Sequence, residues 1–122
     1  MTTTRRQFLR TTALAGALAS AGPYIRAADP ARQYRTALIG CGWWGNNILR
    51  EAIASGRLKV VGLCDVDAKA REITAERVQD LNGDAPAKYN DFRELLEKEK
   101  PEIVLIASPD HWHALQTIAA VK

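Results

Sequence analysis

The sequence predicts an α/β fold, the first part of a doubly wound parallel sheet of the Rossmann type. Three observations over residues 34–122 predict it. Short apolar runs alternate with helical patterns, a G-C-G-W-W-G turn at residues 40–45 follows the first run at once, and the second run ends at Asp65. Strands that alternate with amphipathic helices are typical of parallel β-α-β units, and a glycine-rich turn after the first strand is typical of those that bind dinucleotides.

The spacing of apolar residues and the helix-capping signals predict the individual elements. The last strand is apolar throughout, which predicts cover on both faces and a place beside the first strand, opposite the second. On the second helix, Ala70, Ile73, Val78 and Leu81 are expected to face the core, and Asp67 is expected to be its N-cap. Strands are predicted at 34–39, 58–64, 88–89 and 103–107, and helices at 46–55, 68–81, 91–100 and from about 112 onward.

The positive net charge of the chain comes from its N-terminal segment. Residues 1–28 contain four arginines and no acidic residue, and outside this segment the basic and acidic residues nearly balance. No basic face for nucleic acid is therefore predicted. Arg5 and Arg6 precede Phe8-Leu9 and then a short stretch rich in Ala and Gly. That stretch is too short and too weakly apolar to span a bilayer.

Residues 1–28 are interpreted as a twin-arginine (Tat) signal peptide, because paired arginines before a mildly apolar stretch are typical of this export signal. Arg5 and Arg6 are expected to engage the Tat translocase, and the protein is expected in the bacterial periplasm. An ordinary amphipathic N-terminal helix is the alternative. The Tat route is known for exporting folded proteins that acquire a cofactor before export, which agrees with a bound nucleotide.

Residues 29–33 are expected to form a linker, and residues 34–122 the nucleotide-binding domain. The chain stops at Lys122 inside a helical pattern, so this domain is expected to be truncated before a C-terminal α/β substrate domain. Cys41 and Cys64 lie in strand-like runs without the spacing of a metal site or a disulfide framework. Two small, buried side chains are therefore predicted.

Each glycine of the turn has a predicted task in holding a dinucleotide. Gly40 allows the tight change from strand to helix, Gly42 lets the backbone approach a pyrophosphate, and Gly45 lets the helix pack closely on the sheet. The free N–H groups at the start of the following helix would then bind the anion, helped by the helix dipole.

Asp65 makes the glycine pattern more specific. It follows the second strand and lies 20 residues after Gly45, the spacing at which a carboxylate reaches the hydroxyls of the adenosine ribose. The same carboxylate would repel a 2′-phosphate, and Val66 brings no cation to bind one. NAD is therefore predicted in preference to NADP. A helix cap is the alternative role for Asp65, although Asp67 is better placed for it.

The motifs GCGWWG, LCDVD, YNDFRELL and ASPDHWHA together cover almost all of residues 34–122. In this combination the chain resembles the Gfo/Idh/MocA family of sugar and cyclitol oxidoreductases. The resemblance implies that the glycine loop, the acid after the second strand and the Ser-Pro turn after the fourth strand bind the cofactor. On this chain the implied residues are Gly40, Gly42, Trp43, Trp44, Gly45, Asp65, Ser108, Pro109 and His113.

For an intact relative, the resemblance implies hydride transfer between a sugar carbinol and nicotinamide, with a sugar-like substrate held by the missing domain. The lysine that assists proton transfer belongs to a Glu-Lys-Pro segment expected beyond Lys122, so no catalytic residue is assigned within the chain. Homo-oligomers are left open for the full-length protein. An NAD-dependent glycosidase of the same fold and a non-catalytic dinucleotide-binding fragment are the alternatives.

The aromatic and histidine residues near the glycine turn and near the Ser-Pro turn have several possible roles. Trp43 and Trp44 are expected to shield the loop or to pack against the missing domain. Residues 108–113 are expected near the nicotinamide end, where Trp112 would line the pocket or pack within its helix. His111 and His113 are two residues apart and do not share a helix face, so no metal site is predicted.

Overall fold

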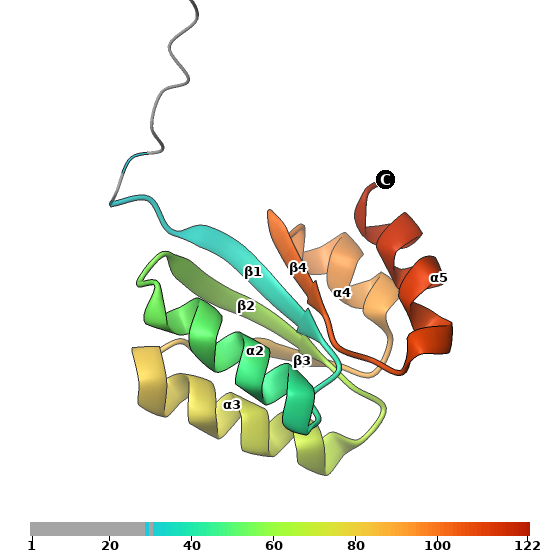
Figure 1. The fold of residues 1–122 in the computed structure, drawn as a ribbon, viewed down its shortest axis with the longest axis horizontal. Coiled ribbons are helices and arrows are strands. Elements are labelled where there is room, and N and C mark those ends of the chain that lie inside the picture. The colour runs from blue at the N-terminus through green and yellow to red at the C-terminus, as the bar shows by residue number, and fades with distance from the viewer. Residues whose placement is uncertain (1–28, 30) are drawn as a thin grey trace, which may run out of the picture. The chain divides into compact units, whose positions relative to one another are not determined.

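The computed structural model describes residue 29 and residues 31–122, and the chain divides into two units, Met1–Pro30 and Ala31–Lys122. The predicted signal peptide lies outside the described residues. In the second unit, four parallel strands form one sheet in the order β3-β2-β1-β4 (Figure 1). The predicted α/β fold with a parallel sheet is confirmed.

Strands and helices alternate along the second unit. β1 has β2 on one side and β4 on the other, so the fourth strand lies opposite the second, as predicted. In the described part of the chain, no helix is both long enough and apolar enough to cross a bilayer. The strands are β1 (Tyr34–Ile39), β2 (Leu58–Cys64), β3 (Ala87–Tyr89) and β4 (Ile103–Ile106), and the helices are α2 (Trp43–Ala54), α3 (Ala68–Asn82), α4 (Phe92–Glu99) and α5 (Asp110–Ala120).

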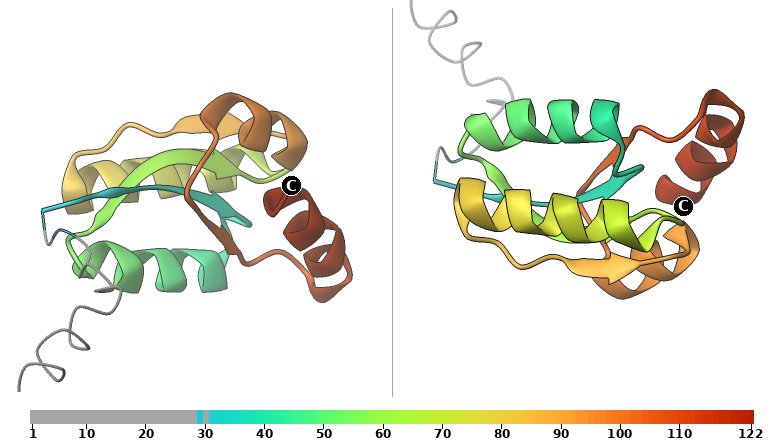
Figure 2. Two further views of the ribbon diagram at one scale, coloured as in Figure 1. Left: turned by 90° about the horizontal axis from the view of Figure 1, so that it is seen from above. Right: turned by 90° about the horizontal axis from the view of Figure 1, so that it is seen from below.

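Helices cover both faces of the sheet (Figure 1 and Figure 2). α2 and α3 pack on one face, where Leu38 and Leu63 lie in one buried cluster. α4 packs on the other face, where Ile39 and Leu95 lie in a second cluster against which Ala119 of α5 also packs. Because β1 and β2 are buried on both faces, the loops that leave their carboxyl ends start from well-anchored positions.

β4 is less buried than the sequence predicted. Its four residues, Ile103–Ile106, are all half-buried. Val104 packs against one core cluster and Leu105 against the other, so both faces of the strand are covered in part. Among the described residues β4 pairs with β1 alone, and its second edge therefore has no strand beside it.

The inner face of α3 agrees with the prediction only in part. Val78 is buried and Ala70 packs against the same cluster, as predicted. Thr74 is fully buried, while Ile73 is 41% exposed and Leu81 is 51% exposed. Thr74 lies inside because its hydroxyl donates to Cys41 O (3.4 Å) and accepts from Asn46 Nδ2 (3.0 Å). An apolar pattern does not predict a buried polar residue whose partners lie on the glycine loop and on another helix.

Two helices begin earlier than predicted. α2 begins at Trp43 and includes Gly45 in its first turn, and α5 begins at Asp110. The predicted cap Asp67 is confirmed, because it accepts backbone N–H groups at the start of α3. Asp91 caps α4 by accepting the backbone N–H of Arg93. The earlier start of α2 brings its first N–H groups directly to the glycine turn.

Candidate functional site

A cavity of about 520 Å³ lies along the carboxyl edge of the sheet. The loops after all four strands, the first turn of α4 and the first two turns of α5 line it. Ligands of open parallel sheets bind at this edge, where the strand order reverses on either side of β1. The cavity brings together five residues predicted to bind the cofactor: Gly40, Gly42, Asp65, Ser108 and Pro109.

Two glycines of the loop make backbone contacts that leave no room for a side chain. Gly40 has a φ of +97°, and a Cβ there would lie 2.6 Å from Ala107 C and from Ser108 N. A Cβ at Gly45 would lie 1.9 Å from Gly40 O. Gly40 is therefore required for its positive φ and for the contact with the end of β4, and Gly45 for the close approach of α2 to the turn.

Gly42 lines the cavity and faces open space. Apart from the two residues next to it in the chain, no residue has an atom within 4 Å of the place its Cβ would take. Gly42 is the N-cap of α2, and no side chain caps the helix there. Asn46 Nδ2 holds the loop by donating to Cys41 O and to Gly42 O, both at 2.9 Å. The open space beside the first N–H groups of α2 fits a phosphate group.

Asp65 is half-buried at the end of β2 and lines the cavity. Its Oδ2 accepts the backbone N–H of Cys41 (2.8 Å), and its Oδ1 accepts the backbone N–H of Asp67 (2.9 Å). These bonds hold the carboxylate in one orientation. Because each oxygen can accept a further hydrogen bond, the carboxylate can still bind two ligand hydroxyls.

Side chains of α5 hold the turn that follows β4. His113 Nε2 donates to Ser108 O (2.6 Å), and Ser108 Oγ donates to Gln116 Oε1. Gln116 is 5% exposed and lines the cavity together with Trp112. His113 does not belong to the cavity wall. If His113 contributes to cofactor binding, it therefore does so by holding Ser108 in position.

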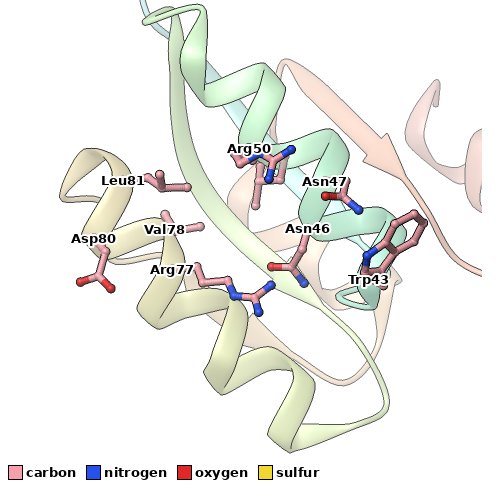
Figure 3. A pocket seen from close by; sticks show the side chains of 9 residues that line it. Trp43, Asn46, Asn47, Arg50, Arg77, Val78, Asp80 and Leu81 are labelled. Atoms are coloured by element: carbon pink, nitrogen blue, oxygen red, sulfur yellow. The ribbon is translucent and has the colours of Figure 1, made fainter.

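Trp43 and Trp44 lie away from this cavity. Trp43 is 78% exposed and Trp44 is 60% exposed, with ring centroids 6.0 Å apart. Trp43 instead lines a second hollow of about 450 Å³ between α2 and α3, where Arg50 and Arg77 also lie (Figure 3). The expectation that these tryptophans shield the loop or pack against another domain stays a prediction.

Residues 90–93, after β3, also line the cavity, although none of them is among the residues predicted to bind the cofactor. Arg71 of α3 links it to the end of β2, because Arg71 NH1 donates to Asp65 O and to Asn90 Oδ1 (3.4 Å). The carboxyl ends of parallel strands meet at one edge of a sheet. Applied to the short third strand, this rule could have predicted that residues 90–93 lie at the site.

Cys41 and Cys64 are buried, as predicted. Burial raises the pKa of the Cys41 thiol to about 12 and that of the Cys64 thiol to about 11, and the nearby Asp65 carboxylate adds to both shifts. Both thiols are therefore protonated and weakly nucleophilic at neutral pH. Over the described residues, three or more His, Cys, Asp or Glu side chains are nowhere grouped so that they could hold a metal ion.

The sequence profile of a family described as an oxidoreductase family with an NAD-binding Rossmann fold matches residues 34–122. The chain belongs to this family, Gfo/Idh/MocA. Its second unit is thus an NAD-binding Rossmann domain, and the prediction of NAD as cofactor is confirmed.

Curated relatives share about 30% of their residues with the chain. A glycosyl hydrolase family 109 protein from Stenotrophomonas maltophilia is 32% identical over 124 residues, which cover 97% of this chain and 27% of that protein. A protein of the same name from Saccharopolyspora erythraea is 30% identical over 141 residues, which cover 97% of this chain and 31% of that protein. The chain thus spans less than a third of the length of these relatives.

Solved structures share the fold. The WlbA dehydrogenase from Chromobacterium violaceum, in complex with NADH and UDP-GlcNAcA, is 26% identical with a TM-score of 0.61, over 75% of this chain and 24% of that one. An NAD-binding protein from Listeria innocua is 29% identical with a TM-score of 0.61, over 74% and 25% of the two chains. The myo-inositol dehydrogenase from Lactobacillus casei, at 22% identity and a TM-score of 0.63, shares the fold over 73% of this chain and 25% of that one.

Proposed function

We propose that residues 34–122 form the adenosine- and pyrophosphate-binding half of an NAD site in an enzyme that acts on a sugar or a cyclitol. The observation that carries this proposal is that Gly42 and Asp65 share one cavity at the carboxyl edge of the sheet. When bound, NAD supplies the hydride acceptor for oxidation of a substrate carbinol. The residues of this chain bind and orient the cofactor and leave the substrate to other parts of the protein.

Gly42 and Asp65 have separate tasks in this proposal. The pyrophosphate takes the open space beside Gly42 and accepts hydrogen bonds from the first N–H groups of α2. Asp65 accepts hydrogen bonds from the two hydroxyls of the adenosine ribose, while Cys41 N–H and Asp67 N–H keep its carboxylate in place. A negative carboxylate at this position favours NAD over NADP, because the 2′-phosphate of NADP would be repelled.

Ser108, Pro109 and Trp112 share the cavity of Asp65. The sequence suggested that this segment lies at the nicotinamide end of the cofactor. The shared cavity favours a different assignment, in which these residues border the adenosine whose ribose is bound by Asp65.

The assignment of NAD to this cavity is tested by calorimetric titration of the 122-residue chain with NAD. Asp65→Ala is expected to weaken binding at least about tenfold, because hydrogen bonds to a charged group contribute about 1.5–3 kcal/mol each. Asp67→Ala is the matched control: it removes a carboxylate two residues away that caps α3, and NAD affinity should stay within about twofold while stability falls by about 1 kcal/mol. Equal NAD affinity in Asp65→Ala and wild type would contradict the proposal.

A glycosidase that uses NAD for transient oxidation of its substrate is the second candidate. The observation that favours it is the name of the curated relatives at 29–32% identity, glycosyl hydrolase family 109 protein. Assays of the protein that contains this domain distinguish the candidates. Net NADH formation with free sugars or cyclitols supports a dehydrogenase, whereas release of an aryl group from aryl glycosides without net NADH formation supports a glycosidase. NAD binding without either activity would favour a non-catalytic module.

We also propose that the Tat translocase exports this protein to the periplasm with its cofactor bound. The support is the Arg5-Arg6 pair with the short apolar stretch that follows it. Lysines at both positions should abolish export of a fused periplasmic reporter through the Tat route, while expression in the cytoplasm continues. Unchanged export of the double variant would contradict this part of the proposal.

A further inference from the structure

The cavity contains a buried amide that the proposed binding of ribose and pyrophosphate does not use. Gln116 is 5% exposed, lies on α5 and lines the cavity that also contains Asp65. Its Oε1 accepts the hydroxyl of Ser108. Within residues 31–122, its Nε2 has no hydrogen-bond partner, and this atom is not sealed from solvent. This unpaired donor of a buried side chain is therefore available to a ligand that accepts a hydrogen bond.

The neighbours of Gln116 fit a planar base. Trp112, from the same helix, and Phe92, at the start of α4, both line the cavity. Arg93 lines it as well, with its guanidinium 4.5 Å from the centroid of the Phe92 ring. Aromatic rings and a guanidinium plane are the groups on which bases stack in proteins. The cavity thus combines stacking surfaces with the buried amide of Gln116.

We propose that the carboxamide of Gln116 recognises the adenine base of the cofactor through the edge that carries N6 and N7. This proposal rests on the proposed NAD site. In it, Nε2 donates to N7, and Oε1 accepts from the N6 amino group with the lone pair that Ser108 leaves free. Glutamine and adenine form this pair of hydrogen bonds in nucleic-acid complexes as well. Gln116 is then a specificity-determining residue for the base, while Asp65 binds the ribose.

Replacement of adenine by hypoxanthine provides a probe that a rotated amide cannot satisfy. On the same edge, hypoxanthine presents O6 and N7, which are both acceptors. A carboxamide offers one donor and one acceptor in either orientation. One acceptor must therefore face another, whichever way Gln116 turns. The dinucleotide with hypoxanthine, deamino-NAD, differs from NAD in the base alone.

The test compares the affinities of the 122-residue chain for NAD and for deamino-NAD by calorimetry. Wild type should bind NAD about tenfold more tightly, within the range known for such base pairs. Gln116→Leu should bring the ratio of the two dissociation constants to about one, chiefly by weakening NAD. Gln79→Leu, on exposed α3 surface, is the matched control and should leave the ratio unchanged.

The outcomes separate the two proposals. A folded wild-type chain that binds neither dinucleotide contradicts the NAD site itself. Equal binding of both by wild type overturns the role of Gln116 and leaves the NAD site intact. The same holds if Gln116→Leu weakens both ligands equally, because a purely structural residue would do this. Should Gln116→Leu not fold, Gln116→Asn withdraws the amide by one methylene group and carries the same expectation.

Discussion

The glycine loop after β1 and the turn after β4 lie against each other at the carboxyl edge, yet they hold their shapes in different ways. The glycine loop depends on missing side chains: Gly40 and Gly45 allow backbone contacts that a Cβ would prevent. The turn after β4 depends on side chains that are present, because His113 and Gln116 of α5 form hydrogen bonds with Ser108. The glycine loop therefore tolerates no added atom at Gly40 or Gly45, while the turn after β4 should tolerate the loss of one contact at a time.

The two regions also differ in how far apart in the sequence their contacting residues lie. The glycines lie within six residues of one another, and their spacing alone sets the contact between α2 and the turn. The turn after β4 needs residues one and two helical turns further along, and it meets Gly40 only because β4 pairs with β1. The shape of the glycine loop thus depends on one short segment, whereas the cavity wall that faces it is formed by segments that lie far apart in the sequence.

The largest effect is expected from Gly45→Ala. The new Cβ would lie 1.9 Å from Gly40 O, so α2 must move away from the sheet. Unfolding free energy, measured by urea denaturation followed by circular dichroism, should fall by about 3 kcal/mol. A loss below about 1 kcal/mol would mean that α2 can shift at little cost, and the loop would then not be as rigid as its contacts indicate.

Gly42→Ala sharpens the comparison within the same loop. Its Cβ would meet no neighbouring atom within 4 Å, so stability should change by no more than about 1 kcal/mol. NAD affinity should nevertheless fall at least about tenfold, which is about 1.4 kcal/mol, because the methyl group takes space proposed for the pyrophosphate. Calorimetric titration measures the affinity and urea denaturation the stability. Full NAD affinity in a folded Gly42→Ala variant would place the pyrophosphate elsewhere.

The smallest effect is expected from His113→Ala in the turn after β4. The variant loses one hydrogen bond to Ser108 O but keeps the contact between Ser108 and Gln116. Stability should fall by about 1 kcal/mol, and NAD affinity by less than about tenfold. His111→Ala, an exposed position on the same helix, is the control and should change neither quantity. Complete loss of NAD binding in folded His113→Ala would indicate a direct contact between His113 and the cofactor.

Sequence reasoning was accurate where the cause of a structure is local. The bounds of β1 and β2 and the cap Asp67 follow from short patterns. It was wrong where burial depends on partners elsewhere. Thr74 lies on the inner face of α3 in place of Ile73 because its partners belong to the glycine loop and to α2, and the apolar periodicity of α3 does not contain this relation.

The same contrast applies to the candidate site. By itself, the sequence determined the glycine loop and Asp65, because the spacing of a strand, a turn and a second strand is set by backbone geometry over one β-α-β unit. Only the tertiary structure decided that residues 90–93, Trp112 and Gln116 join Asp65 in one cavity and that Trp43 and Trp44 lie outside it. The physical reason is that a cavity wall is made by packing helices from opposite ends of the domain onto one sheet, and those distances are not encoded in any single segment.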